Sequence, residues 1–153
     1  MTGKMSKIST VGVVGAGQMG NGIAHVCALG GYDVLLNDAD PARIDTAIQT
    51  ITKNLTRQVQ RGIIKQGDMD GALKRTKGAA KMSDLAACDI VIESIVEQDE
   101  AKRKVFSDLK AVLRPDAILA SNTSSISITR LAATTDRPAT WCRPTPIRWT
   151  SRR

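Results

Sequence analysis

The feature that most constrains the fold of this chain is the glycine-rich run Gly15-Ala16-Gly17-Gln18-Met19-Gly20. It follows a short apolar run over residues 8–14 and opens a segment of helical character that extends to Leu29. A second apolar run covers residues 33–37, and Asp38 comes directly after it, 18 residues beyond Gly20. A strand, a glycine turn, a helix, a second strand and an acidic residue, in this order, are typical of a dinucleotide-binding unit. The turn alone would be a weak signal, and its ordered surroundings make it a strong one.

Each part of this motif has a predicted role. Gly15 permits a tight turn after the strand, Gly17 lets the backbone approach a pyrophosphate, and Gly20 lets the helix pack close to the strand. The unpaired N–H groups at the start of the helix favour anionic phosphates. Asp38 is expected to accept hydrogen bonds from the adenosine ribose and to repel a 2′-phosphate, which predicts NAD rather than NADP. The alternative is a structural turn followed by a solvent-facing aspartate.

Length and composition limit the classes of protein to which this chain can belong. A chain of 153 residues is long enough for one domain with its own core, and four aromatic residues mean that aliphatic side chains must fill that core. No apolar run is long enough to cross a membrane, and residues 1–7 are polar. Cys27, Cys88 and Cys142 lack metal-type spacing and are expected to be free thiols. The sequence therefore predicts a cytoplasmic protein with no metal site and no membrane partner.

The net charge of +7 is unevenly distributed. Four arginines lie beyond residue 137, and no acidic residue follows Asp136. Residues 1–137 therefore carry 18 basic and 15 acidic side chains, a net charge of +3. Because the basic excess lies mostly in the tail, the sequence does not predict nucleic-acid binding. A contact between this tail and an acidic partner is an alternative use for it.

Helices and strands alternate along the rest of the chain. Asp40-Pro41 is a helix start, and a helical apolar face follows it to near Gly62. A second helical face begins at about Val105 and ends at Arg114-Pro115. The remaining expected elements are a short helix at residues 68–73 and strands at residues 77–81, 90–92 and 117–120.

This alternation predicts an α/β fold, a doubly wound parallel sheet of Rossmann type with strand order 3-2-1-4-5. Ligands of such sheets bind beyond the carboxyl ends of the strands. The Gly15 turn, Asp38, residues 93–97 and residues 121–125 all fall at that edge. Polar segments from four separate strands therefore converge on one predicted site.

Three segments together carry a family resemblance. They are VGVVGAGQMGNGIA at 11–24, CDIVIESIVEQ at 88–98 and LASNTSSISIT at 119–129. In these segments the chain resembles the NAD-binding half of the 3-hydroxyacyl-CoA dehydrogenases, and most of all the bacterial 3-hydroxybutyryl-CoA dehydrogenases. The resemblance covers nearly all of residues 7–138, which we expect to form the dinucleotide-binding domain. It implies reversible oxidation of a 3-hydroxyacyl-CoA, with hydride transfer to NAD, in fatty-acid or butanoate metabolism.

The resemblance also implies roles for individual residues. Glu97 and Lys102 match family positions that contact the cofactor near its nicotinamide end. Ser124 matches the serine that bonds the 3-oxygen of the substrate, and Asn122 supports the same loop. The alternative for Ser124 is a helix cap, because a run of Ser and Thr precedes Ile126.

Asn54 and Arg61 fall on the long helix where the family contacts coenzyme A. The acyl-CoA substrate is thus the partner that the resemblance implies. The alternative for these two residues is an ordinary solvated helix face.

The chain departs from the family after residues 136–138. The family depends on a histidine paired with a glutamate, in a segment that should begin there, whereas residues 139–153 contain no histidine and no acidic residue. The only histidine, His25, is expected to pack within the first helix rather than act as a base. The resemblance therefore predicts that this chain is catalytically deficient, and a non-catalytic NAD-binding module is the alternative function.

Residues 139–153 form an atypical basic tail with two prolines and both tryptophans, and we expect it to be disordered. Pro144 and Pro146 exclude it as a central strand. The family's helical second domain, which completes the active site and the homo-oligomer, has no counterpart in these 153 residues. A frameshift near codon 138 would explain the change in composition. The strand at residues 117–120 would then be a bare edge, which predicts marginal stability.

Overall fold

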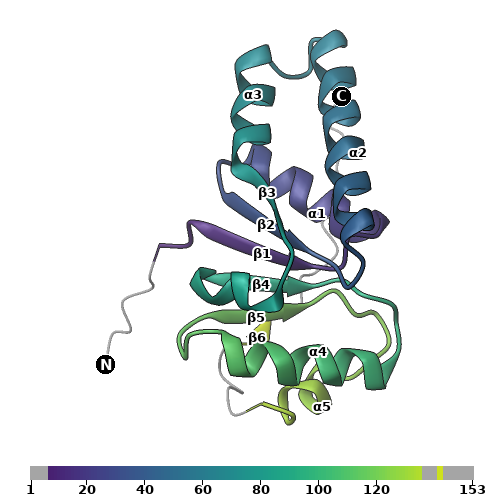
Figure 1. Ribbon diagram of the computed structural model, residues 1–153, viewed down its shortest axis with the longest axis vertical. Coiled ribbons are helices and arrows are strands. Elements are labelled where there is room, and N and C mark those ends of the chain that lie inside the picture. Colours follow the sequence, from purple (N-terminus) through teal and green to yellow (C-terminus); the bar gives the residue numbers. More distant parts are fainter. Residues whose placement is uncertain (1–6, 136–140, 143–153) are drawn as a thin grey trace.

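A parallel sheet forms the centre of the molecule (Figure 1). The computed structural model describes residues 7–135 and 141–142. Within them the strands are β1 (Thr10–Val14), β2 (Asp33–Asn37), β3 (Thr76–Ala79), β4 (Ile90–Glu93), β5 (Ile118–Ser121) and β6 (Trp141–Cys142). Their order across the sheet is β3-β2-β1-β4-β5-β6, and all pairings are parallel. The predicted fold class and the order of the first five strands are confirmed.

Helices connect the strands, as the alternation predicts. They are α1 (Gln18–Leu29), α2 (Pro41–Gln60), α3 (Gln66–Arg75), the 3-10 helix η1 (Met82–Ala87), α4 (Asp99–Val112) and α5 (Ile128–Ala132). The start of α2 is the predicted one: the Asp40 carboxylate accepts a hydrogen bond from the N–H of Ala42 (3.0 Å), and Pro41 occupies the first turn. In Figure 1, α1, α2 and α3 gather around the β3-β2-β1 half of the sheet, and α4 and α5 around the other half.

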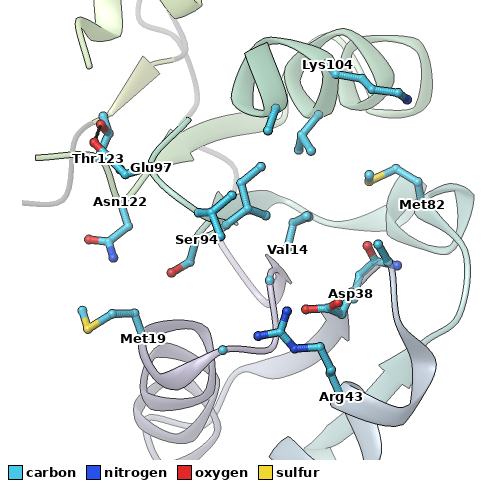
Figure 2. Close-up of a pocket in the computed structure, with 18 of the residues that line it drawn as sticks. Val14, Met19, Asp38, Arg43, Met82, Ser94, Glu97, Lys104, Asn122 and Thr123 are labelled. Carbon is cyan, nitrogen blue, oxygen red and sulfur yellow. Dashed lines mark hydrogen bonds between the residues drawn. The ribbon is translucent and has the colours of Figure 1, made fainter. Parts of the chain in front are cut away.

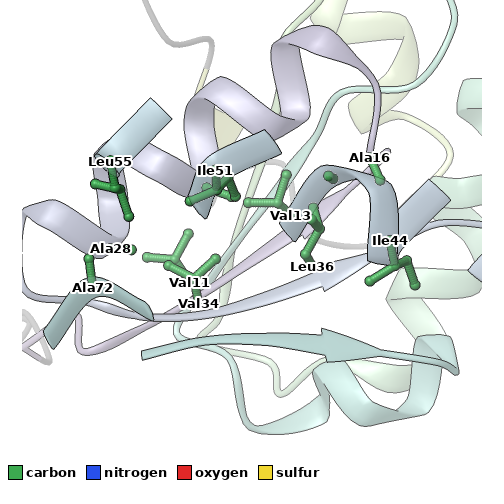
Figure 3. Packing of buried hydrophobic residues seen from close by; sticks show 12 residues of the cluster. Val11, Val13, Ala16, Ala28, Val34, Leu36, Ile44, Ile51, Leu55 and Ala72 are labelled. Atoms are coloured by element: carbon green, nitrogen blue, oxygen red, sulfur yellow. The ribbon is translucent and has the colours of Figure 1, made fainter. Parts of the chain in front are cut away.

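Two apolar clusters cover the two faces of the sheet. Successive residues of a strand point to opposite faces, and β1, β2 and β4 each contribute to both clusters. Val13 and Leu36 pack with Ile51 of α2 in one cluster (Figure 3). Val91 packs with Phe106 of α4 in the other. Helices packed on both faces leave the carboxyl ends of the strands as the edge open to a ligand.

The last strand corrects one expectation. β6 pairs with β5, with Leu119 opposite Trp141 and Ala120 opposite Cys142. The prediction that residues 117–120 form a bare edge is therefore wrong. Both residues of β6 precede the prolines of the tail and keep a backbone N–H, and an edge position is compatible with prolines nearby in sequence. The disorder expected for the rest of the tail concerns residues outside those described.

Within the described residues, no helix combines the length and the apolar character that crossing a bilayer requires.

Candidate functional site

A cavity of about 1040 Å³ lies beyond the carboxyl ends of β1, β2, β4 and β5 (Figure 2). Its lining includes the glycine turn, Asp38, residues 94–97 and residues 122–124. The structure thus brings together the four polar segments that the sequence placed at this edge. These segments are far apart in the chain, and parallel pairing aligns the strand ends that carry them.

The glycine turn has the shape that the motif predicts. Gly15 has a φ of +106°, and its N–H donates to the carbonyl of Asn37 (2.8 Å). A Cβ on Gly15 would overlap the carbonyl oxygen of Ser94, and a Cβ on Gly20 would overlap the carbonyl oxygen of Gly15. A Cβ on Gly17 would meet only the guanidinium of Arg43, at 3.8 Å. Gly15 and Gly20 therefore allow the chain to pack, while Gly17 leaves its face of the turn open to a ligand.

The start of α1 is suited to an anion. Gly17 is the N-cap and offers no side chain to the N–H groups of the first turn, which contains no acidic residue. Unpaired N–H groups and the helix dipole favour a phosphate at such a position. Gly17, Gln18 and Met19 line the cavity here, while Gly20 lies buried beneath the turn.

Asp38 faces the same cavity from the end of β2. Its Oδ2 accepts a hydrogen bond from the N–H of Ala16 (2.7 Å), and its Oδ1 accepts one from the N–H of Asp40 (3.0 Å). These bonds fix the carboxylate beside the glycine turn, where a ribose would follow a bound pyrophosphate. Arg43, in the first turn of α2, lines the cavity next to Asp38 (Figure 2). The residues present therefore fit the adenosine and pyrophosphate portions of a dinucleotide.

Glu97 holds the opposite wall of the cavity. Its Oε1 accepts hydrogen bonds from the hydroxyl of Thr123, from the N–H groups of Ser124 and Ser125 (both 3.2 Å) and from the hydroxyl of Ser125 (2.9 Å). Its Oε2 lies 3.5 Å from Nζ of Lys102. Burial raises the pKa of the Glu97 carboxyl, but the hydrogen bonds from Thr123 and Ser125 and the charge of Lys102 outweigh it and hold that pKa at about 2. Glu97 is therefore an anion that anchors the loop after β5.

Lys102 is not on the cavity surface. Its side chain is completely buried behind the wall, with Nζ 2.6 Å from Oε1 of Glu93. The resemblance implies that Lys102 contacts the cofactor, and in this structure its ammonium instead faces Glu93 and Glu97. Its role at the nicotinamide end stays a prediction.

The loop that carries Asn122 and Ser124 opens into the cavity, and both residues line it. The helix-cap alternative for Ser124 does not hold, because Ser127 is the N-cap of α5 and its hydroxyl accepts from the N–H of Arg130 (3.4 Å). Ser124 is exposed. It is thus placed where a ligand could reach it, and its contact with the substrate stays a prediction.

The two residues predicted to contact coenzyme A do not line this cavity. Asn54 lines a second cavity of about 720 Å³, between the start of α1 and α2, together with Ala16, Asn21 and Thr50. Arg61, the C-cap of α2, lies outside the linings of both cavities. The structure therefore does not bring Asn54 and Arg61 together with Ser124.

His25 is also remote from the chemistry predicted for this family. It is buried on α1 and lies outside the lining of either cavity. Burial lowers the pKa of its imidazole, and the neighbouring Gln58 side chain opposes that shift. His25 is thus a packed residue of the α1–α2 contact, as expected. Among residues 7–135 and 141–142, no group of three or more His, Cys, Asp or Glu side chains is arranged to hold a metal ion.

Three contributors to the site were not singled out from the sequence, although two of them, Glu93 and Thr123, lie in segments that it placed at this edge. Glu93 accepts from Lys102 beneath the wall, Thr123 donates to Glu97, and Arg43 lines the cavity beside Asp38. Arg43 had a sequence signal, since a basic residue in the first turn of a helix opposes the usual preference for acidic residues there. Glu93 had one as well, since it is a carboxylate ending an otherwise apolar strand.

The family model for the 3-hydroxyacyl-CoA dehydrogenase NAD binding domain matches residues 10–143. The chain belongs to this family. Its cofactor is therefore NAD, as predicted from the turn and Asp38.

Relatives of this NAD-binding domain include named dehydrogenases. A 3-hydroxybutyryl-CoA dehydrogenase of Bradyrhizobium diazoefficiens is 58% identical over 131 residues, covering 86% of this chain and 45% of the relative. A probable 3-hydroxybutyryl-CoA dehydrogenase of Deinococcus radiodurans is 41% identical over 128 residues, covering 84% of this chain and 46% of the relative. The crystal structure of (S)-3-hydroxybutyryl-CoA dehydrogenase from Ralstonia eutropha superposes with a TM-score of 0.87 at 41% identity, covering 90% of this chain and 48% of that one. The chain spans about half the length of these relatives.

Proposed function

We propose that this chain is the NAD-binding portion of a dehydrogenase that converts 3-hydroxybutyryl-CoA to acetoacetyl-CoA. The observation that supports it best is the convergence of the glycine turn, Asp38, Glu97 and Ser124 on one cavity. The names of the relatives in Bradyrhizobium diazoefficiens and Ralstonia eutropha support the choice of acyl-CoA. Bound NAD would supply the hydride acceptor for this oxidation.

In this proposal the residues of the chain bind and orient. The N–H groups at the start of α1 hold the pyrophosphate, and Asp38 holds the adenosine ribose. Glu97, supported by Lys102, lies at the nicotinamide end. Ser124 donates a hydrogen bond to the 3-oxygen of the substrate, and Asn122 shapes the loop beside it. Asn54 and Arg61 would meet the coenzyme A portion along α2.

We further propose that residues 1–153 alone bind NAD without turning over substrate. They contain one histidine, His25, and it is buried away from the cavity. A positioned general base contributes ~10²–10⁴ to rate, so a chain without one should be slow by at least that factor. This observation also favours the second candidate function, a non-catalytic NAD-binding module. The cytoplasmic setting and the homo-oligomer stay predictions.

Two measurements on the purified chain test these proposals. Calorimetric titration with NADH should show binding at one site per chain, with weaker binding of NADPH. Absorbance at 340 nm, followed with NADH and acetoacetyl-CoA, should show no oxidation above the rate without protein. Failure to bind NADH would contradict the proposed site. Rapid NADH oxidation that requires acetoacetyl-CoA would contradict the catalytic deficiency and leave the dehydrogenase proposal standing.

A further inference from the structure

Beneath the cavity wall lies a buried carboxylate, Glu93, for which the proposed roles leave no function. We propose that Glu93 is a positioning residue, which acts through Lys102 to hold Glu97 and the loop at residues 123–125 in the geometry that receives the nicotinamide end of the cofactor. This inference rests on the proposed function, because it takes Glu97 and that loop as the wall at the nicotinamide end.

The contacts of Glu93 join three elements. It is the last residue of β4, and its side chain is completely buried. Its Oε2 accepts a hydrogen bond from the hydroxyl of Ser121 at the end of β5 (2.6 Å). Its Oε1 accepts from the N–H of Ile95 (2.7 Å) and from Nζ of Lys102 on α4 (2.6 Å). Glu93 therefore fixes the ends of two neighbouring strands relative to the helix that follows.

Lys102 passes this constraint toward the cavity. An ammonium group has three donors, and three acceptors surround this one. They are Oε1 of Glu93, the carbonyl of Ile95 (3.4 Å) and Oε2 of Glu97 (3.5 Å). Since the lysine side chain has no exposed surface, its ammonium has no water-facing alternative position. The position of Glu97 Oε2 therefore depends on the partner that Glu93 provides for Lys102.

Glu97 completes the connection to the loop. Its Oε1 accepts four hydrogen bonds from residues 123–125, including one from the N–H of Ser124. A continuous series of polar contacts thus runs from Ser121 through Glu93, Lys102 and Glu97 to the loop that presents Ser124.

The energetics favour positioning over simple stabilisation. Burying both members of an ion pair costs desolvation free energy that offsets most of their attraction, so such pairs add little net stability. Removing the charge of one partner leaves the other buried and uncompensated. If Glu93 loses its charge, the Lys102 ammonium is left with Glu97 as its only carboxylate partner. Glu97 is then drawn toward α4 and away from its place in the cavity wall.

The test compares NADH with ADP-ribose, which carries the same adenosine and pyrophosphate but lacks nicotinamide. Affinities of the full chain for both ligands are measured by calorimetry. In Glu93→Gln we expect the NADH affinity to fall by roughly tenfold relative to that for ADP-ribose, the equivalent of about one charge-assisted hydrogen bond. General loss of structure would weaken both ligands together, so the ratio separates positioning from folding.

Asp89→Asn is the matched control, because Asp89 precedes β4 at the opposite end of the strand. Its carboxylate accepts from the N–H groups of Ser9 and Thr10 (both 2.9 Å) and pairs with Arg114 (2.8 Å). This variant also replaces a multiply bonded, paired carboxylate by an amide, far from the cavity. It should leave the affinity ratio unchanged.

If Glu93→Gln does not fold, Ser121→Ala removes one donor to Glu93 and should lower the ratio in the same direction by a smaller factor. An unchanged ratio in the folded variant overturns the positioning role while the proposed function stands. A wild-type chain that binds neither ligand overturns the proposed function, and the inference with it.

Discussion

Two glycines of α1 allow a sharp test of the dinucleotide-binding turn. Gly20 and Gly22 lie two residues apart in the same helix, so replacement of either by alanine raises helix propensity equally, by about 0.5–1 kcal/mol. Their surroundings differ. A Cβ on Gly20 would overlap the Gly15 carbonyl oxygen and lie 2.8 Å from its carbon, whereas a Cβ on Gly22 would meet nothing within 4 Å.

The difference between the two variants isolates the cost of this overlap. Overpacking a close contact costs ~1–3 kcal/mol, and a clash with backbone belongs at the upper end because backbone has no rotamer in which to move aside. We therefore expect Gly20→Ala to be about 3 kcal/mol less stable than Gly22→Ala. At ~2–4 °C per kcal/mol for a chain of this size, the melting temperatures should differ by about 6–12 °C.

Urea and thermal unfolding followed by circular dichroism measure the stabilities, and calorimetry measures NADH binding. Gly22→Ala should melt slightly above the wild type and bind NADH with the same Kd. Gly20→Ala should melt lower and bind more weakly, because Gly15 can only relieve the overlap by displacing the turn that is proposed to hold the pyrophosphate. Equal melting temperatures and equal NADH affinities for the two variants would refute the close packing of α1 on this turn.

Three further predictions concern single side chains. Asp38→Asn should raise the ratio of NADPH affinity to NADH affinity, measured by calorimetry, by roughly tenfold, because repulsion between a carboxylate and a 2′-phosphate at a protein surface is worth on the order of 1–4 kcal/mol. An unchanged ratio would contradict this role of the Asp38 carboxylate. The pKa of the Glu97 carboxyl is lowered to about 2, so the stability that its charge contributes is complete above the ordinary pKa of 4.5 and is lost as the pH falls toward 2. In urea unfolding, the free energies of Glu97→Gln and the wild type should therefore converge over this pH range. A difference that persists at the lowest pH would contradict this role of the charge. Burial, reinforced by the charge of Asp89, raises the pKa of the Cys88 thiol to about 11. Mass-spectrometric mapping should therefore find Cys88 alkylated by iodoacetamide at pH 8 only after the chain is unfolded. Rapid labelling of Cys88 in the folded chain would contradict its burial and raised pKa.

Much of the fold was predictable from local patterns. The strand–turn–helix start, the Asp40-Pro41 cap and the apolar face of α2 are short-range features, because helix and strand periods and capping preferences act between residues close in sequence. The order of the first five strands followed from the parallel topology that such alternation requires. The sequence did not predict that β6 pairs with β5. The prolines that follow β6 exclude a central strand there, but they do not determine whether two residues before them pair at the edge of the sheet.

The candidate site likewise combines features that the sequence predicts with contacts that only the tertiary structure shows. The sequence by itself determined the glycine turn, Asp38 and their convergence with residues 93–97 and 121–125, because parallel strands bring their carboxyl ends to one edge whatever the side chains. Only the tertiary structure decided that Lys102 lies behind the wall rather than on it, and that Glu93 and Thr123 complete the contacts around it. Hydrogen bonds between β4, α4 and the loop after β5 depend on distances across three elements. The spacing of residues in the sequence does not determine these distances between elements. The packing of α4 against the sheet determines them in this structure.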